Sequence, residues 1–152
     1  MMSFWEERAQ QVVSGHRIIF MAIASASGGT ESASGEVTSD GTEYLAGVIE
    51  LGMPEADSGP FRGDVEMLMV SSKHRNQGIG KKLIYELERT ALERGRTLLQ
   101  LATMADTVAD AHFYPKLGYV KFGTVPNYGI EPVTMRLVDG AYFYKDLARP
   151  ST

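Results

Sequence analysis

The stretch that most restricts how this chain can fold is DVEMLMVSSKHRNQGIGKKLIYELERTALERG, residues 64–95. It begins with an apolar run, 64–71, that is typical of a β-strand. From Gly80 onward, apolar residues recur with the period of an amphipathic helix, which Gly95 is expected to end. Between these elements lies a turn with basic residues and two glycines, Gly78 and Gly80, but no acid. A strand, a glycine-rich turn and a helix in this order predict an α/β fold.

The rest of the chain alternates between the same two kinds of element. We expect helices at 4–13 and 106–118, and further strands at 17–25, 44–53, 96–104, 119–125 and 140–147. The strand at 64–71 is apolar on both faces, so it should lie centrally and be covered on both sides. The polar stretch 27–43 predicts a loop between neighbouring strands, with a linker between domains as the alternative. This order predicts a mixed, mostly antiparallel sheet flanked by helices.

Composition narrows the class of protein. A length of 152 residues predicts a single domain, 1–152, and a net charge of −4 argues against a general nucleic-acid binder. Without cysteine there is no disulfide, thiolate nucleophile or zinc–thiolate site, and no carboxylates or histidines show metal-ligand spacing. The charged start and the lack of a long apolar run predict no signal peptide and no membrane partner. We expect a cytoplasmic protein.

The turn at 71–80 has the chemistry of an anion site. A helix N-terminus offers unpaired N–H groups and the positive end of the helix dipole, and glycines let an anion approach the backbone. Two common phosphate motifs are excluded: a P-loop would need glycine where Arg75 stands, and a dinucleotide fingerprint would need glycine at Leu83. An ordinary strand-to-helix turn remains the alternative.

Two motifs give this chain a resemblance to a known family. RNQGIG (75–80) resembles the Gln/Arg-x-x-Gly-x-Gly/Ala signature of the GCN5-related N-acetyltransferases, and FYPKLGY (113–119) resembles the family's second hallmark. Within that family the pattern is most similar to small-molecule acetyltransferases related to the tabtoxin-resistance enzyme. The family usually opens with a strand and a helix before the element expected at 4–13. The resemblance therefore implies a fold of this family that lacks its first strand and first helix. It leaves a sheet edge that either a partner subunit covers, as in a homodimer, or a shortened form leaves open.

The resemblance implies that acetyl-CoA is the acyl donor, with no metal. The residues implied at its pyrophosphate are Arg75, Asn76, Gln77, Gly78, Ile79, Gly80 and Lys81. The backbone of Leu68, Met69 and Val70 is implied to pair with the pantetheine arm, and Thr107 stands near the place of an asparagine that the family often carries.

The catalytic residues implied by the resemblance are Tyr114, Asp64 and Glu66. Tyr114 matches the family's general acid, which protonates the leaving thiolate; a half-buried helix tyrosine is the alternative. Asp64 falls at the place of the family's carboxylate base, and Glu66 shares its face of the strand. A carboxylate on a covered strand should have a raised pKa. A solvated strand end is the alternative for Asp64.

The implied function is transfer of an acetyl group to a primary amine of a small molecule by direct attack. Candidate acceptor-binding residues are Asn127, Tyr128 and Tyr142, for which core or edge packing is the alternative. Two other functions remain open. One is a non-catalytic acyl-CoA-binding sensor or regulatory subunit, and the other is a peptide or protein N-acetyltransferase.

Overall fold

Six strands form one sheet in the order β1-β2-β3-β4-β6-β5. The computed structural model describes residues 3–25 and 43–149, so the predicted loop at 27–43 lies outside the described residues apart from Glu43. The helices are α1 (Phe4–Val13), α2 (Ile79–Glu93) and α3 (Tyr114–Lys116), with short turns η1 (Ser72–His74) and η2 (Ala109–Phe113). The strands are β1 (Arg17–Ser25), β2 (Glu43–Gly52), β3 (Arg62–Val70), β4 (Leu98–Met104), β5 (Val120–Ile130) and β6 (Leu137–Asp146).

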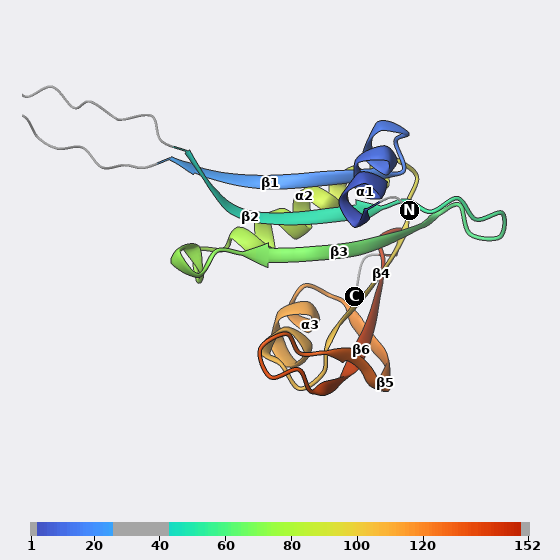
Figure 1. The fold of residues 1–152 in the computed structure, drawn as a ribbon. Coiled ribbons are helices and arrows are strands. Elements are labelled where there is room, and N and C mark those ends of the chain that lie inside the picture. Colours follow the sequence, from blue (N-terminus) through green and yellow to red (C-terminus); the bar gives the residue numbers. More distant parts are fainter. Residues whose placement is uncertain (1–2, 26–42, 150–152) are drawn as a thin grey trace, which may run out of the picture.

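All neighbouring strands pair antiparallel except β3 and β4, which confirms the predicted mixed, mostly antiparallel sheet. The parallel pair is short and extends only from Arg62↔Leu98 to Asp64↔Gln100. Beyond Asp64 the two strands diverge, and Figure 1 shows the sheet opening between β3 and β4. This opening divides the sheet into a β1–β3 part and a β4–β6 part.

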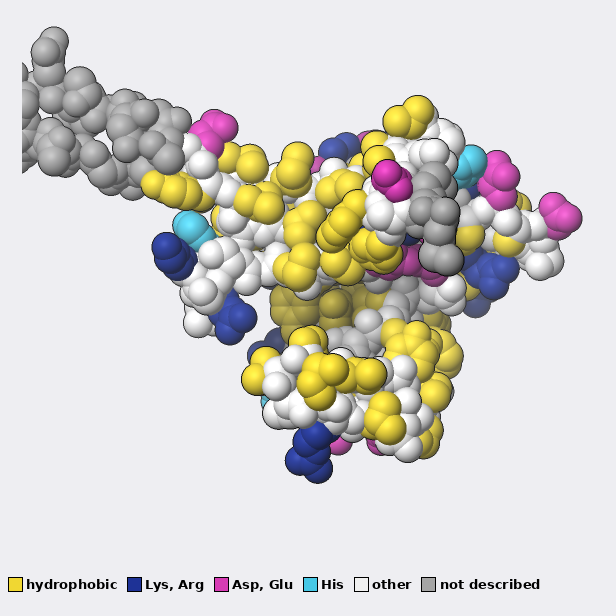
Figure 2. Space-filling model, in the orientation of Figure 1, with side chains coloured by type: hydrophobic (Ala, Val, Ile, Leu, Met, Phe, Trp, Pro, Cys, Tyr) yellow, Lys and Arg dark blue, Asp and Glu magenta, His cyan; other side chains and the backbone are white. Residues whose placement is uncertain are grey.

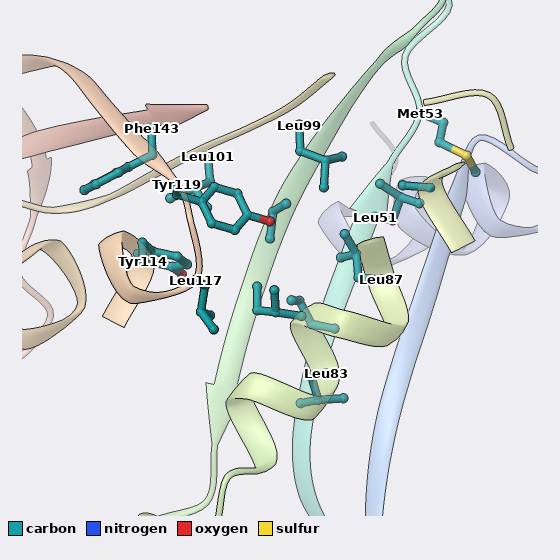
Figure 3. Packing of buried hydrophobic residues seen from close by; sticks show 14 of the residues in the cluster. Leu51, Met53, Leu83, Leu87, Leu99, Leu101, Tyr114, Leu117, Tyr119 and Phe143 are labelled. Carbon is teal, nitrogen blue, oxygen red and sulfur yellow. The ribbon is translucent and has the colours of Figure 1, made fainter. Parts of the chain in front are cut away.

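One cluster of buried side chains extends across both parts of the sheet. The amphipathic helix α2 packs its apolar face on β1–β3, and in Figure 1 it lies behind these strands while α1 lies in front. Figure 3 shows the cluster running from Leu51 and Met53 at one side to Tyr114 and Phe143 at the other. Burial of these apolar side chains supplies the main driving force for folding.

The front face of the β1–β3 part is less covered than the sequence predicts. The expectation that β3 is buried on both faces is wrong, because the Met69 side chain is 51% exposed. The side chains of Phe4, Trp5 and Met21 are also more than half exposed, and α1 contains no buried residue. Helix α1 packs mainly on β1, with Arg8 reaching Glu50 on β2 and Glu66 on β3, so the far end of β3 stays open.

The C-terminal elements differ from prediction in extent. The helix expected at 106–118 is a π-helical turn, η2, followed by the short α3, which ends one residue beyond Pro115. β5 and β6 are longer than predicted because their pairing resumes after an irregularity between Val125 and Gly129. Alternation of apolar and polar residues does not reveal such a bulge, since a bulge breaks the alternation while keeping the strand.

Within the ranges 3–25 and 43–149, no helix is both long and apolar enough to cross a membrane.

Candidate functional site

A cavity of about 550 Å³ lies where β3 and β4 diverge. Figure 2 shows the molecule hollowed between the β1–β3 part and the β4–β6 part. The lining residues are Arg8, Asp64, Val65, Glu66, Met67, Leu68, Gln100, Leu101, Ala102, Thr103, Tyr114, Tyr128 and Tyr142. Among the described residues, no strand pairs with β3 on its β4 side beyond Asp64. The edge of β3 is therefore available to an extended ligand that pairs like a further strand.

A bulge in β3 lies beside this cavity. The β2–β3 register shifts between Val48↔Met69 and Glu50↔Glu66, which leaves Met67 and Leu68 opposite one β2 residue. Met67 has a φ of 54°, a left-handed conformation that a non-glycine residue adopts only when its surroundings enforce it. Sequence reasoning missed this feature, because methionine carries no turn signal.

The glycine turn, residues 71–80, follows the end of β3 as predicted. Gly78 has a φ of 76° and caps α2 without a side-chain hydrogen bond, so no side chain blocks the first N–H groups of the helix. Nothing lies within 4 Å of the position a Cβ would take on Gly78. Arg75, Asn76, Gln77 and Lys81 are exposed around it, and Ile79 is half-buried.

Gly80 has a different role from Gly78. It is buried, and a Cβ there would lie 3.2 Å from Cζ of Phe113 and 3.7 Å from Cγ2 of Val70. Gly80 therefore lets the start of α2 pack closely on β3 and η2, whereas Gly78 leaves the backbone open to an anion.

Tyr114 lies in the wall of the cavity and is only 7% exposed. Its ring makes edge contacts with Phe113 and Tyr119, at centroid distances of 5.2 Å and 5.7 Å. Burial raises the pKa of Tyr114 to about 12, so the phenol keeps its proton at neutral pH. The half-buried position proposed as the alternative is thus a fully buried one that also contacts the cavity.

A charge cluster of Arg8, Arg17, Glu50 and Glu66 lies under α1 at the middle of β3. Arg17 Nη1 donates to Oε2 of Glu50 at 2.7 Å and to Oε2 of Glu66 at 2.8 Å. Arg8 Nη1 donates to Oε2 of Glu66 at 3.0 Å and also to Glu50. Each carboxylate therefore has two guanidinium partners, as buried charges require.

The expectation of a raised carboxylate pKa is wrong for Glu66. Burial by itself raises the pKa of Glu66, but the hydrogen bonds and charges of Arg17 and Arg8 outweigh burial and hold it below the ordinary value. A carboxylate stabilised in this way is a weak base.

Asp64 lies at the last β3–β4 pair, where the cavity begins. It is half-buried, and its Oδ1 accepts a hydrogen bond of 2.8 Å from Nε2 of Gln100. Asp64 is the third residue of β3 and lies within the sheet rather than at a solvated strand end. Asp64 and Glu66 both line the cavity, as expected for residues on one face of a strand.

The remaining candidates separate into two groups. Tyr128 and Tyr142 line the cavity, with ring centroids 5.1 Å apart, and a hydrogen bond with Tyr128, together with burial, raises the pKa of Tyr142 to about 12. Asn127 is exposed, does not line the cavity, and has a φ of 51°. Thr107 Oγ1 donates to the Met104 carbonyl at 2.8 Å and accepts from the Asp110 N–H at 3.2 Å, so it caps the η2 turn.

Sequence reasoning also missed several cavity residues, among them Arg8, Gln100 and Thr103. Arg8 belongs to the helix expected at 4–13. No local signal marks these residues, because their position depends on which strands and helices come together.

Comparison with known proteins identifies the family. Residues 6–119 match the acetyltransferase (GNAT) family, so the chain belongs to this family. A structure of a putative acetyltransferase from Salmonella typhimurium with its cofactor acetyl-CoA has a TM-score of 0.60 and 20% identity, covering 71% of this chain and 63% of that one. This chain thus spans less than two thirds of the length of the Salmonella protein.

Two further structures cover nearly all of this chain. Spermidine/spermine N-acetyltransferase from Vibrio cholerae has a TM-score of 0.66 and 16% identity, covering 95% of this chain and 74% of that one. The NatC complex bound to Gag peptide and CoA has a TM-score of 0.70 and 20% identity, covering 97% and 81%. These likenesses establish the shared fold.

Proposed function

We propose that this chain is an acetyl-CoA-dependent N-acetyltransferase that acts on a primary amine of a small molecule. The observation that carries the proposal is the divergence of β3 from β4 after Asp64. It leaves a strand edge and a cavity that the buried Tyr114 lines, and β3 leads on to the glycine turn at the start of α2. We also propose that the described residues act as one domain, since one hydrophobic cluster extends across both parts of the sheet.

The glycine turn fits the pyrophosphate of acetyl-CoA. The N–H groups at the start of α2 and the open space at Gly78 suit an anion, and the exposed Arg75 and Lys81 add positive charge. Pairing of the pantetheine amide groups with the edge of β3 at Leu68–Val70 is supported by the end of the β3–β4 pairing at Asp64. Thr107 is engaged in capping η2, and we assign it a structural role.

Two side chains of the cavity, Tyr114 and Asp64, are assigned the two proton transfers of the reaction. When bound, the donor supplies a thioester carbonyl and a thiolate leaving group. Tyr114, kept protonated by burial, donates a proton to that thiolate. Only the neutral amine is a nucleophile, and Asp64, whose described side-chain partner is the neutral Gln100, accepts the ammonium proton through a water. Glu66, held by Arg8 and Arg17, contributes negative charge instead of acting as the base.

A small acceptor is favoured by the size of the cavity. Its volume of about 550 Å³ suits a compact ligand, and aromatic side chains from β5 and β6 bound it. The Vibrio relative is named for polyamines and the NatC complex contains a peptide, so the fold is compatible with both kinds of acceptor.

Thiol release from acetyl-CoA, measured with a panel of small amines and a short peptide, tests the proposed function. We expect at least one small amine to accelerate thiol release well above hydrolysis and above the rate with peptide. Faster turnover of the peptide would instead favour peptide acetylation. Tight binding of CoA without amine-dependent thiol release would favour a sensor or regulatory subunit.

A further inference from the structure

Tyr128 separates the cavity at the β3–β4 opening from a second hollow. The second hollow has a volume of about 330 Å³ and shares three lining residues with the first, namely Ala102, Thr103 and Tyr128. The Tyr128 side chain is 56% exposed, so its ring is not part of the core. Because the ring borders both hollows, removing it would join them.

A bulge in β5 directs Tyr128 to this position. Pairing stops at Val125↔Gly140 and resumes at Gly129↔Val138, so residues 126–128 lie opposite a single β6 residue, Asp139. The left-handed Asn127 is held by a hydrogen bond of 2.9 Å from its N–H to Oδ1 of Asp139. Bulges of this kind re-aim a side chain beside an active site.

Gly140 provides the surface on which the Tyr128 ring lies. A Cβ on Gly140 would come within 2.6 Å of Cδ1 and 2.8 Å of Cγ of Tyr128, distances that real Cβ atoms do not adopt. The ring therefore fills the space that any larger residue at position 140 would need. The Tyr128 ring also makes an edge-to-face contact with the ring of Tyr142.

The wall of the cavity formed by β3 suits one positive charge. Asp64 has no arginine partner among the described residues, whereas Glu66 is already compensated by Arg8 and Arg17. Arg8 lines the same cavity and disfavours a second cation there. An acceptor that suits the cavity therefore has one ammonium group, which faces Asp64, and an apolar or aromatic group, which contacts Tyr128.

Building on the proposed function, we propose that Tyr128, seated on Gly140, selects the acceptor and restricts it to compact monoamines with an apolar or aromatic group. Tyr128 is the selecting residue, and Gly140 is a positioning residue that acts through it. The second hollow lies beyond the reach of such an acceptor as long as the ring stays in place.

Relative kcat/KM values for four amines test this inference: butylamine, phenethylamine, putrescine and naphthylethylamine. For the wild type we expect phenethylamine to exceed butylamine by about tenfold, because of its contact with the ring. Putrescine, with its second charge, and naphthylethylamine, with its larger group, should both be poorer than butylamine.

Four variants distinguish the contribution of the Tyr128 ring from that of Gly140, on which the ring packs. Tyr128→Ala should lower the preference for phenethylamine over butylamine and raise turnover of naphthylethylamine by about tenfold, since the hollows then join. Tyr128→Phe keeps the ring and should keep the wild-type order. Gly140→Ala should raise KM for phenethylamine, whereas Gly123→Ala, whose Cβ meets nothing within 4 Å, should not.

The inference is overturned if Tyr128→Ala shows the wild-type ratios, or if the wild type prefers putrescine. If no amine is acetylated by any variant, the proposed function fails, and calorimetric binding of phenethylamine to the CoA complex then decides the inference separately. Binding lost in Tyr128→Ala and kept in Tyr128→Phe supports it; equal binding by both, or none by the wild type, overturns it. Circular dichroism confirms that each variant is folded.

Discussion

At the end of β3, the glycine turn is made by ten consecutive residues, 71–80. At the middle of β3, the charge cluster joins Arg8, Arg17, Glu50 and Glu66 from four separate elements, with partners up to 58 positions apart in sequence. Strand β3 therefore adjoins a turn formed by consecutive residues and also contributes to a cluster whose members meet only in the folded chain. Loss of a residue should affect ligand binding at the first and stability at the second.

The largest effect is expected from breaking the charge cluster. Arg17→Ala leaves Glu50, which is 3% exposed, with a single guanidinium partner, and should lower the free energy of unfolding by about 3 to 5 kcal/mol. Urea denaturation measures the change. Arg89→Ala is the matched control, because the partners of Arg89 are exposed on α2 and its loss should cost far less. Equal losses in both variants would show that the cluster contributes no more than a surface pair.

A smaller effect is expected at Tyr114, in the wall of the cavity. Tyr114→Phe keeps the buried ring but removes the acid, and should lower kcat by about 100-fold or more with little change in KM. Since burial raises the pKa of Tyr114 to about 12, the required protonated form persists below that pH. The wild-type rate should therefore show no loss from this group until the pH approaches 12.

Tyr85→Phe serves as the control for Tyr114→Phe, because Tyr85 is exposed on α2 and does not line the cavity. Its kcat should match the wild type. An unchanged kcat in Tyr114→Phe at every pH would exclude the acid role and leave Tyr114 as a core residue alone.

The smallest effect is expected at the glycine turn. Gly78 and Gly95 stand at opposite ends of α2 with φ values of 76° and 72°, and neither has a neighbour within 4 Å of its Cβ position. Alanine at either position should cost about 1 kcal/mol of stability through left-handed strain. Only Gly78→Ala should also weaken CoA binding, by about tenfold, because its Cβ would stand where the anion approaches.

Calorimetric titration with CoA measures the affinity of the two alanine variants, and urea denaturation measures their stability. Equal CoA affinities in Gly78→Ala and Gly95→Ala would place the phosphate elsewhere. A loss confined to Gly78→Ala would show that the glycine turn binds through its backbone.

The sequence predicted those parts whose structure depends on neighbouring residues. The period of apolar residues located α2, whose start was expected at Gly80 and lies at Ile79, and Gly95 marked its end. The strand preceding the glycine turn was also placed correctly, because a run of apolar, strand-forming residues bounded by turns has few other solutions. Tyr114 was singled out through its motif, but its degree of burial was not predicted.

The parts that were missed depend on contacts between distant segments. The low pKa of Glu66 requires Arg8 and Arg17, and the bulge at Met67 requires a β2 register that no residue type announces. The seat of Tyr128 on Gly140 depends on a second bulge, between Val125 and Gly129.

The sequence by itself determined the order of the elements, the position of the glycine turn and the family to which the chain belongs. Only the tertiary structure decided that Arg8 and Arg17 pair with Glu66 and that Tyr128 and Tyr142 line the cavity. The physical reason is that backbone preferences and apolar periodicity act over a few residues. Burial and charge pairing, in contrast, are properties of groups that become neighbours only in the folded chain.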